Sequence, residues 1–567
     1  MHFPLWLQAS VRSGAEQPGT AHVCRAAQVS NPAARRTAMR TERYLAFALA
    51  WFSLTLCLGA SLAWAEDHAA AKATDPLGNI NRLPADLERK VGQLRTNLEG
   101  NGFAVARGYW TLWGIEDCKY PLQTLGYCYG NNPTAPYVVA VVPQWKDEYA
   151  DPRFHHIVNE PLRNMSATYR LDTHEALIVV AQLPPEARYF GIGSNVFTRE
   201  AEFDPKDTKD PIYPQVTDPL LRGILFGVSP DPSRRMMVAS IGNSTNNVII
   251  GEQTGEDPWN RPAYIIITSD AELEKEMTDA LKGLGVHEHD IFTEPVSPDL
   301  VNLGLGRSAD DLITYIRYAM PLDQAAGEQW RRDLPLTILR VRDMRSKTYN
   351  HSLPVPTYGS RTANYDETKL AADLTTLQNA VIASWGPKVT ATILPFFSAY
   401  KFLDLIGQHC LGYPDAERGP MDCLGDSPDA DYQISGSAQI DNGEVVAVVG
   451  VLSTKTENAT YTSLSVNWFP ELVGVANIDD TTLEGTASSI PGAPSNSDLF
   501  YVYYVARDCS GLTHCVAVSK KLVPTGGIIK FIQRNYINPG SSSGPNPDYI
   551  LNPVTIVLDG GKRPTVQ

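Results

Sequence analysis

Short apolar runs, each followed by a segment of period-two alternation, occur in two parts of this chain, and the pattern predicts short β-strands. Residues 177–183 read LIVVAQL and residues 445–452 read VVAVVGVL, two runs rich in β-branched side chains. The segments at 189–197 (YFGIGSNVF) and 461–469 (YTSLSVNWF) alternate large and small side chains, as expected of strands covered on one face. Short strands of this kind, with Gly, Pro and Asn at the turns, favour β-sandwiches or jelly rolls.

These segments belong to two stretches of the chain that match each other. Residues 128–137 (CYGNNPTAPY) and 423–432 (CLGDSPDADY) share Cys, Gly, Pro, Ala and Tyr at the same offsets. Farther on, residues 172–183 and 441–452 share Asp, Glu, Val-Val and Leu without a gap. Three more pairs continue the alignment in order: Tyr189 with Tyr461, Asn195 with Asn467, and Phe197 with Phe469. The sequence therefore predicts a duplicated β-unit.

The middle of the chain has a mixed pattern, in which buried-strand runs alternate with stretches of helical period. The helical stretches begin at Asp or Ser and end at Gly or Pro, the usual start and stop signals. The predicted elements are strands at 263–270 and 334–344 and helices at 271–285, 308–320, 366–386 and 395–407. We therefore predict a β-rich α+β fold in which two related β-sandwich or jelly-roll-like lobes are joined by a central α/β and helical region.

The N-terminal segment has the pattern of an export signal. Residues 39–65 combine a basic start, an apolar run and the small-x-small site Ala63-Trp64-Ala65, which predicts cleavage after Ala65. A membrane anchor is the alternative, but the apolar run is short and no basic flank follows it. Residues 1–38 are interpreted as lying upstream of the true start. We expect a secreted or periplasmic protein with a first lobe at 66–260, a central region at 261–408 and a second lobe at 409–567.

The charge of the chain limits the classes of partner. It carries 48 Lys and Arg against 63 Asp and Glu, a formal net charge of −15. An acidic surface repels phosphate backbones and anionic lipid, so the sequence argues against nucleic acid and against membrane binding after signal cleavage. A neutral small molecule or a glycan is compatible with this charge, and the oligomeric state is left open.

The cysteines outside the N-terminal segment predict disulfide bonds. Six of the eight cysteines lie beyond the export signal, and an even number in an exported chain indicates bridges, with fifteen connectivities open. Proximity in the sequence favours Cys118–Cys128, Cys410–Cys423 and Cys509–Cys515. The last pair is expected to close the tip of a β-hairpin. Without a C-x-x-C array, thiolate metal binding is not expected.

One short stretch resembles a known kind of protein. Residues 183–197, LPPEARYFGIGSNVF, are similar to a Pro-x-Ala-Arg-Tyr-Phe strand start found in exported bacterial proteins of unknown function built from tandem β-sandwich domains. The resemblance implies a fold and no activity.

A metal site is one candidate for chemistry. His287 and His289 with Glu294 give an H-x-H-x4-E spacing that resembles part of the cupin metal motif. The flanking glycines of that motif are replaced here by Leu281 and Val301. We therefore interpret the histidines as a solvated strand start and predict no metal and no cofactor.

Paired carboxylates offer a second candidate, because the acid and base of a glycosidase can be far apart in sequence. The acidic side chains around the second matching stretch are Asp404, Asp426, Asp429, Asp431 and Glu444. The alternative interpretation is a solvated acidic turn. No G-x-S-x-G elbow is present.

Asparagine-rich segments form the third candidate. The residues are Asn243, Asn246 and Asn247 between two expected β-runs, and Arg534, Asn535 and Tyr536 near the C-terminus. Uncharged donors and acceptors beside aromatic rings suit neutral polar ligands such as glycans, although asparagine is also common in turns. We expect an exported protein that binds a neutral polar ligand at loops or between the lobes. The alternative is an exported hydrolase whose carboxylates converge in an interlobe cleft.

Overall fold

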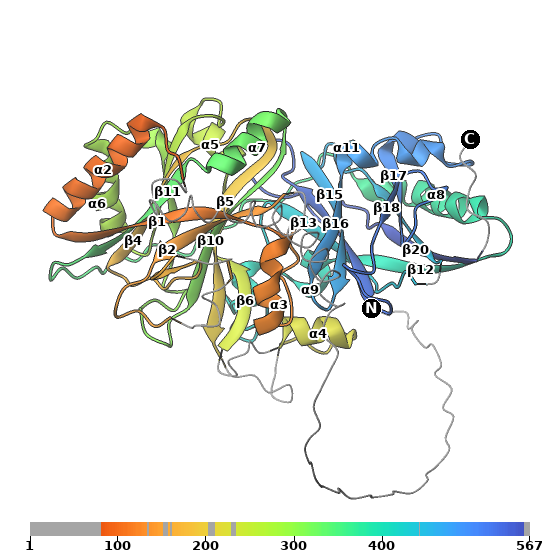
Figure 1. Ribbon diagram of the computed structural model, residues 1–567, viewed down its shortest axis with the longest axis horizontal. Helices are drawn as coiled ribbons and strands as arrows, with labels where there is room; N and C mark the ends of the chain where they lie inside the picture. The colour runs from red at the N-terminus through yellow and green to blue at the C-terminus, as the bar shows by residue number, and fades with distance from the viewer. Residues whose placement is uncertain are drawn as a thin grey trace, which may run out of the picture. The chain divides into compact units, whose positions relative to one another are not determined.

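The computed structural model describes residues 81–132, 135–150, 157–158, 162–201, 210–227, 234–441 and 443–560 of the 567-residue chain (Figure 1). The predicted export signal at 39–65 and the segment 1–38 lie outside the described residues. Among the residues described, no helix is both long and apolar enough to cross a membrane.

The first lobe is built on an 11-stranded sheet. Its main strand order is β6-β5-β10-β2-β1-β11-β4-β8-β9, with β3 paired to β2 and β7 paired to β5. The strands are β1 (Phe103–Trp113), β2 (Tyr137–Pro143), β3 (Met165–Ser166), β4 (Glu175–Gln182), β5 (Ala187–Glu200), β6 (Arg234–Ser240), β7 (Thr245–Asn246), β8 (Pro262–Thr268), β9 (Ile291–Pro295), β10 (Asp311–Pro321) and β11 (Leu336–Asp343).

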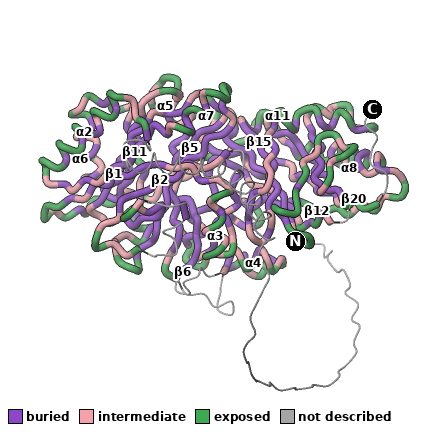
Figure 2. Tube along the Cα trace, in the orientation of Figure 1, coloured by how far each residue is buried: buried purple, intermediate pink, exposed green. Residues whose placement is uncertain are grey.

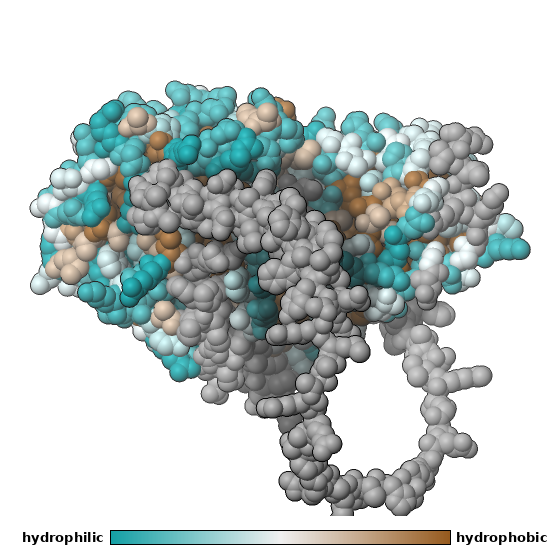
Figure 3. Space-filling model, in the orientation of Figure 1, coloured by the Kyte–Doolittle hydropathy of each residue, from teal (hydrophilic) through white to brown (hydrophobic). Residues whose placement is uncertain are grey.

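Helices cover and connect the strands of the first sheet. They are α2 (Ala85–Gly100), η1 (Ile115–Cys118), α3 (Lys119–Thr124), α4 (Pro219–Leu225), α5 (Asn247–Thr254), α6 (Ala271–Lys282), η2 (Glu288–Asp290) and α7 (Gln324–Asp333). In α6, Leu273, Met277 and Leu281 recur every four residues and are buried on one face, where α6 lies beside α2 (Figure 1). The surface over α5 and α7 is mostly hydrophilic (Figure 3).

The second lobe is built on a nine-stranded sheet of order β16-β15-β19-β13-β12-β20-β14-β17-β18. Its strands are β12 (Val389–Ser398), β13 (Ala430–Ser435), β14 (Val445–Val451), β15 (Tyr461–Phe469), β16 (Val473–Asp479), β17 (Phe500–Ala506), β18 (Cys515–Ala517), β19 (Ile528–Tyr536) and β20 (Val554–Gly560). Its helices are η3 (Glu367–Leu370), α8 (Ala371–Ser384), α9 (Ala399–Leu403), α10 (Gly407–Cys410), α11 (Asp480–Leu483), η4 (Thr486–Ser489) and η5 (Ser497–Leu499). The strands of both sheets are largely buried (Figure 2).

The two sheets have the same topology. When strands are matched in chain order, β1 with β12 through β11 with β20, and the two-residue β3 and β7 are set aside, the order across both sheets is identical. The terminal pair is parallel in each lobe, β8 with β9 and β17 with β18. The segments aligned by sequence at 172–183 and 441–452 contain the corresponding strands β4 and β14. That the lobes arose by duplication stays a prediction.

The β-rich class with two lobes is confirmed, and the middle region contains the expected mixture of strands and helices. The sheets divide this region between them. Strands β8 to β11 lie in the first sheet, and β12 lies in the second. We therefore define the first lobe as residues 85–343, the second lobe as 367–560, and the linker as 344–366.

Two of the predicted helices are wrong in whole or in part. The segment 308–320 forms strand β10, because it lies between β5 and β2 and is buried on both faces, which outweighs its local capping pattern. The segment 395–407 begins as the end of β12 and becomes helical only at α9, which ends at Asp404 with a positive φ of 49°. The predicted helix at 366–386 is confirmed as η3 and α8.

All three predicted disulfides are confirmed: Cys118–Cys128, Cys410–Cys423 and Cys509–Cys515. The expected hairpin around the last bridge is wrong. Strands β17 and β18 pair in parallel, with Tyr504 opposite Cys515, so the bridge closes a loop that leads back to the start of the neighbouring strand.

Candidate functional site

The two matching motifs lie where the lobes meet, and each binds the other lobe. The backbone N–H of Cys128 donates to the Glu471 carbonyl at 2.7 Å, and that of Gly130 donates to the Leu472 carbonyl at 2.7 Å. In the reciprocal contact, Cys423 and Gly425 donate to the carbonyls of Met237 (2.7 Å) and Val238 (2.9 Å) of the first lobe. The C-x-G spacing is therefore an interlobe docking motif in both copies.

The glycine of this motif is required by the backbone conformation. Gly130 has a φ of 63° and Gly425 a φ of 69°, values in the left-handed region that favour glycine. The residue after it caps a backbone amide of the other lobe: Asn131 Oδ1 accepts from Gly474 N at 2.8 Å, and Asp426 Oδ1 accepts from Ser240 N at 2.8 Å.

Two arginines complete this reciprocal arrangement. Arg317 on β10 donates to the Gly425 carbonyl at 2.9 Å, and Arg534 on the corresponding β19 donates to the Gly130 carbonyl at 3.0 Å. The lobes are thus joined by two copies of one set of contacts, as in an isologous interface of a dimer.

A cavity of about 110 Å³ lies between these contacts, and we call it the inner cavity. Eight aromatic side chains line it: Trp113, Tyr129, Tyr137, Phe197 and Tyr315 of the first lobe, Tyr358 of the linker, and Tyr400 and Tyr432 of the second lobe. Its charged lining residues are Arg361, Arg534 and Asp426. Both lobes and the linker are needed to form the wall.

Guanidinium groups lie over several of these rings. The Arg317 carbon Cζ is 4.7 Å from the ring centre of Tyr315, the Arg361 Cζ is 4.2 Å from that of Tyr400, and the Arg534 Cζ is 5.9 Å from that of Tyr432. Ring faces attract cations, so these contacts hold positive charge around the cavity.

A wider hollow of about 550 Å³ shares part of its wall with the inner cavity, and we call it the outer hollow. Tyr358, Gly359, Arg361 and Tyr400 line both spaces. The outer hollow adds Lys401, Asn546, Pro547 and Asp548, and Lys401 Nζ lies 2.8 Å from Asp548 Oδ1. The shared residues therefore form a junction between the two spaces.

The asparagine-rich segments support the wall. Asn243 donates to the Thr357 carbonyl of the linker at 3.1 Å. Asn246 is the N-cap of α5, so the second expected β-run there is a helix, and its Nδ2 donates to Asp429 at 3.1 Å. Asn247 Oδ1 accepts from Phe190 N at 3.2 Å.

Of the three C-terminal residues, only Arg534 lines the cavity. Asn535 accepts from the Thr462 hydroxyl at 2.9 Å, inside the second lobe. The Tyr536 ring centre is 4.6 Å from that of Tyr189 and 5.5 Å from that of Tyr461. Ligand contact by all six residues of the asparagine set stays a prediction.

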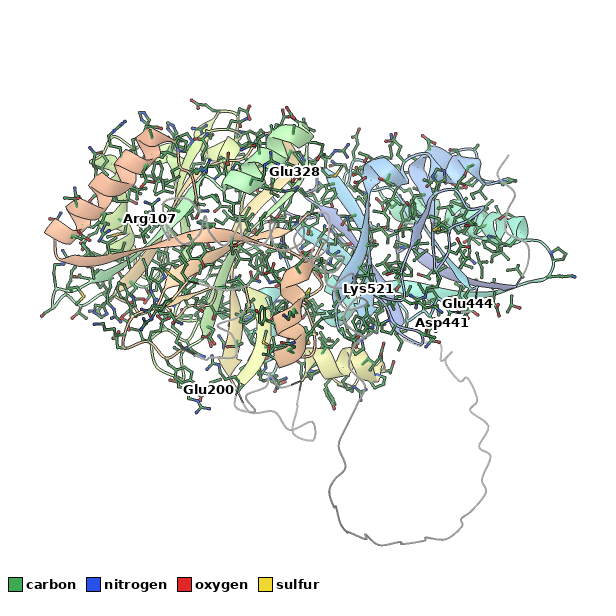
Figure 4. The ribbon with its side chains drawn as sticks, viewed as in Figure 1. Arg107, Glu200, Glu328, Asp441, Glu444 and Lys521 are labelled. Atoms are coloured by element: carbon green, nitrogen blue, oxygen red, sulfur yellow. A yellow bond between two sulfur atoms is a disulfide. The ribbon has the colours of Figure 1, made fainter. Side chains whose placement is uncertain are left out.

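The five candidate carboxylates do not meet at one point. Only Asp426 lines the inner cavity, and its oxygens accept from Ser240 N, Ser240 Oγ and Gly407 N. Asp404 pairs with His409 and Arg418. Glu444 accepts from the backbone N–H of Asp441 at 2.9 Å, and the two lie together in the second lobe (Figure 4).

Burial raises the pKa of the remaining two candidate carboxylates, Asp429 and Asp431. Desolvation raises the pKa of Asp429 to about 6, although Asn246 and Tyr189 donate hydrogen bonds to it. Desolvation also raises the pKa of Asp431 to about 7, against the nearby positive charges of Arg361 and Lys401. Ala430 and Tyr432 line the inner cavity, so the alternation along β13 places Asp431 on the opposite face.

The three residues of the candidate metal site, His287, His289 and Glu294, have separate surroundings. His287 is exposed, and its ring lies 5.3 Å from that of His289. Glu294 is buried and accepts hydrogen bonds from the Ser194 N–H and hydroxyl at 2.5 and 3.1 Å. Within the described parts of the chain, no group of three or more His, Cys, Asp or Glu is placed to hold a metal ion.

The aromatic wall itself was not predicted from the sequence. Tyr137 and Tyr432 close the two matching motifs and Phe197 is aligned with Phe469, so the alignment includes three of the eight rings. Tyr358 and Arg361 lie in a linker without a strand or helix pattern, and Trp113 and Tyr400 follow no motif. Only the docking of the lobes brings these residues together.

Comparisons with known proteins give no family. No family model and no curated protein matches the chain. Among solved structures, one match is an uncharacterised protein from Burkholderia cenocepacia, with 9% identity and a TM-score of 0.32 over 83% of this chain and 94% of that one.

Proposed function

We propose that this protein binds a small ring-bearing molecule in the inner cavity. The proposal is carried by the convergence of eight aromatic side chains and two guanidinium groups from both lobes and the linker. Ligand sites are typically concave and mostly apolar, with a few placed polar groups that fix orientation. A neutral polar ring such as a sugar unit is an expected ligand, because its apolar faces suit aromatic walls and its hydroxyls accept from arginine.

A cationic ligand is disfavoured. The rings of Tyr315, Tyr400 and Tyr432 already face guanidinium groups of the protein, and a second cation would be repelled by them.

Binding is tested by titration calorimetry with monosaccharides, disaccharides and small aromatic compounds. Tyr400→Ala should weaken the affinity about 10-fold by removing a ring that lines both spaces. Tyr365→Ala is the matched control, because this tyrosine is 38% exposed and lines neither space. Equal affinity of both variants, or no binding by any compound, contradicts the proposal.

A hydrolase is the second candidate, and the buried carboxyls with raised pKa near the cavity favour it, since such groups gather at active sites. Binding is the better supported of the two, because Asp426 in the cavity wall is occupied by three donors. To distinguish a binding protein from a hydrolase, a glycan that binds is incubated with the protein and the mixture is analysed by chromatography. New products that do not form with Asp426→Asn favour the hydrolase.

We also propose that the chain is exported, with cleavage after Ala65, and that its lobes arose by duplication. The three disulfides support an oxidising compartment, and the identical strand orders support a common origin. N-terminal sequencing of the mature protein should begin at Glu66. Recovery of residues 39–65 in the mature chain contradicts cleavage.

A further inference from the structure

Arg361 occupies the junction of the inner cavity and the outer hollow. Its two terminal nitrogens donate to main-chain carbonyls, Nη1 to Pro545 at 3.3 Å and Nη2 to Ala430 at 3.0 Å, and its guanidinium lies on the Tyr400 ring. These contacts fix the side chain but do not neutralise it. No carboxylate of the described residues lies within ion-pair distance of Arg361.

Other arginines held inside the lobes are neutralised by acids. Arg340 pairs with Glu148 and Glu175, and Arg199 pairs with Asp310. Around the inner cavity the pattern differs, because Arg317, Arg361 and Arg534 donate to carbonyls and hydroxyls.

The acids near Arg361 balance its charge only in part, because Asp429 and Asp431 lie close enough to interact with its positive charge but neither is hydrogen-bonded to it. Asp426 is the one carboxylate among the lining residues, and three donors occupy it. Asp431 faces away from the cavity on β13 and is not in hydrogen-bond contact with Arg361. Among the residues that line the inner cavity, two arginines therefore accompany one aspartate, with Arg361 at the junction.

We propose that the ligand of the inner cavity is a ring-bearing carboxylate, whose ring lies among the tyrosines and whose carboxylate is bound by Arg361 at the junction. The proposal rests on the proposed function and narrows its ligand class. Guanidinium suits a carboxylate because its planar N–H groups match the two oxygens, and such charge-assisted bonds are about twice as strong as neutral ones.

Two sources share this chemistry, a sugar acid and an aromatic acid, and the experiment separates them. Calorimetry on the full mature chain compares glucuronate with glucose and benzoate with benzamide, each pair differing in the carboxylate. One acid should bind about 10- to 100-fold more tightly than its neutral counterpart, and raising the salt concentration should weaken only the acid.

Arg361→Gln should abolish this preference, so that the variant binds the acid and its neutral counterpart within about 3-fold of each other. Arg361→Lys, which keeps the charge but loses the planar donors, should retain part of it. Arg332→Gln, an exposed arginine on α7, is the control and should change nothing. Because the comparison of acid with neutral compound in the unmodified protein needs no variant, misfolding of a variant leaves the test intact.

The outcomes separate the two proposals. If the acid and the neutral compound bind equally, or if the preference for the acid survives Arg361→Gln, the proposed carboxylate ligand is wrong. The proposed binding of a ring-bearing molecule is not contradicted by either result. If no ring-bearing compound of either kind binds, both proposals fail.

Discussion

The two lobes share one strand order and differ in what fills them. At positions that the strand registers make equivalent, the first lobe is apolar and the second is polar. The pairs are Val138 with Gln433, Phe190 with Thr462, Ile316 with Gln533, Tyr318 with Asn535, and Ile338 with Thr555. All ten are buried or nearly so. The same ladder of strands therefore accepts either kind of interior.

The polar interior is connected by hydrogen bonds. Gln533 donates to Gln433 at 3.0 Å, Gln433 donates to Asn552 at 3.1 Å, and the Tyr501 hydroxyl donates to Gln533 at 2.5 Å. A buried polar group costs little only when it is paired, so this network satisfies the polar residues that lie among the apolar clusters of the second lobe.

The segments that connect the last two strands of each lobe also differ, with an apolar contact in the first lobe and a polar one in the second. Between β10 and β11 the first lobe has α7, whose Trp330 packs on Tyr318 with ring centres 5.1 Å apart. Between β19 and β20 the second lobe has an irregular segment at 537–553 that supplies Asn552. What the lobes have in common is the interlobe docking motif and the strand order.

Each lobe buries an acid whose pKa is raised to about 7, and these two acids give the largest expected effect. Desolvation raises the pKa of Glu294 to about 7 and that of Asp431 to about 7. Between about pH 4.5 and 7 the unfolded state has lost these protons and the folded state has kept them, so stability falls as pH rises. The unfolding free energy should decrease by roughly 3 kcal/mol per group from pH 4 to pH 8.

Urea unfolding across this pH range measures the effect. Glu294→Gln and Asp431→Asn should each flatten the profile, and Glu252→Gln, an exposed acid on α5, is the control. A profile that rises towards pH 8 contradicts the assignment.

Exchanging an interior residue between the lobes tests the comparison directly. Ile338→Thr places the second-lobe residue in the first lobe, where no polar network surrounds it. We expect a loss of about 2–4 kcal/mol, because apolar contacts are lost and a hydroxyl is buried among apolar side chains. Chemical denaturation measures this loss. A cost below about 1 kcal/mol would mean that the first lobe tolerates polar residues as the second does.

Replacing the glycine of the interlobe docking motif should lower the stability by a similar amount in either lobe. An added Cβ at Gly130 or Gly425 meets no atom closer than 4.0 and 3.6 Å, so the main penalty of Gly130→Ala or Gly425→Ala is the positive φ. About 1–2 kcal/mol is expected for each. Thermal unfolding should show similar shifts, and a much larger effect of one than of the other would break the equivalence of the motifs.

The sequence predicted the features that depend on local pattern. Strands β4 and β14, helices α6 and α8 and the three disulfides follow from alternation, helical period and cysteine proximity. It failed at 308–320, where burial between two strands overrides a helix signal. The site could not be predicted, because Trp113, Arg361 and Tyr400 are far apart in sequence and meet only when the lobes dock.

The smallest expected effect comes from the converse exchange in the second lobe. Thr555 is fully buried between Leu394 and Val448 of the neighbouring strands, and its hydroxyl has no hydrogen-bond partner within the described residues. Thr555→Val replaces that hydroxyl with a methyl group of nearly the same size, so it removes an unpaired polar atom without opening a cavity. We expect a gain of about 1 kcal/mol, opposite in sign to the effect of Ile338→Thr. Denaturant midpoints of the two variants give both signs in one experiment. A loss of stability in Thr555→Val would show that the hydroxyl is paired within the polar interior, and the two lobes would then differ in the completeness of that network as well as in its presence.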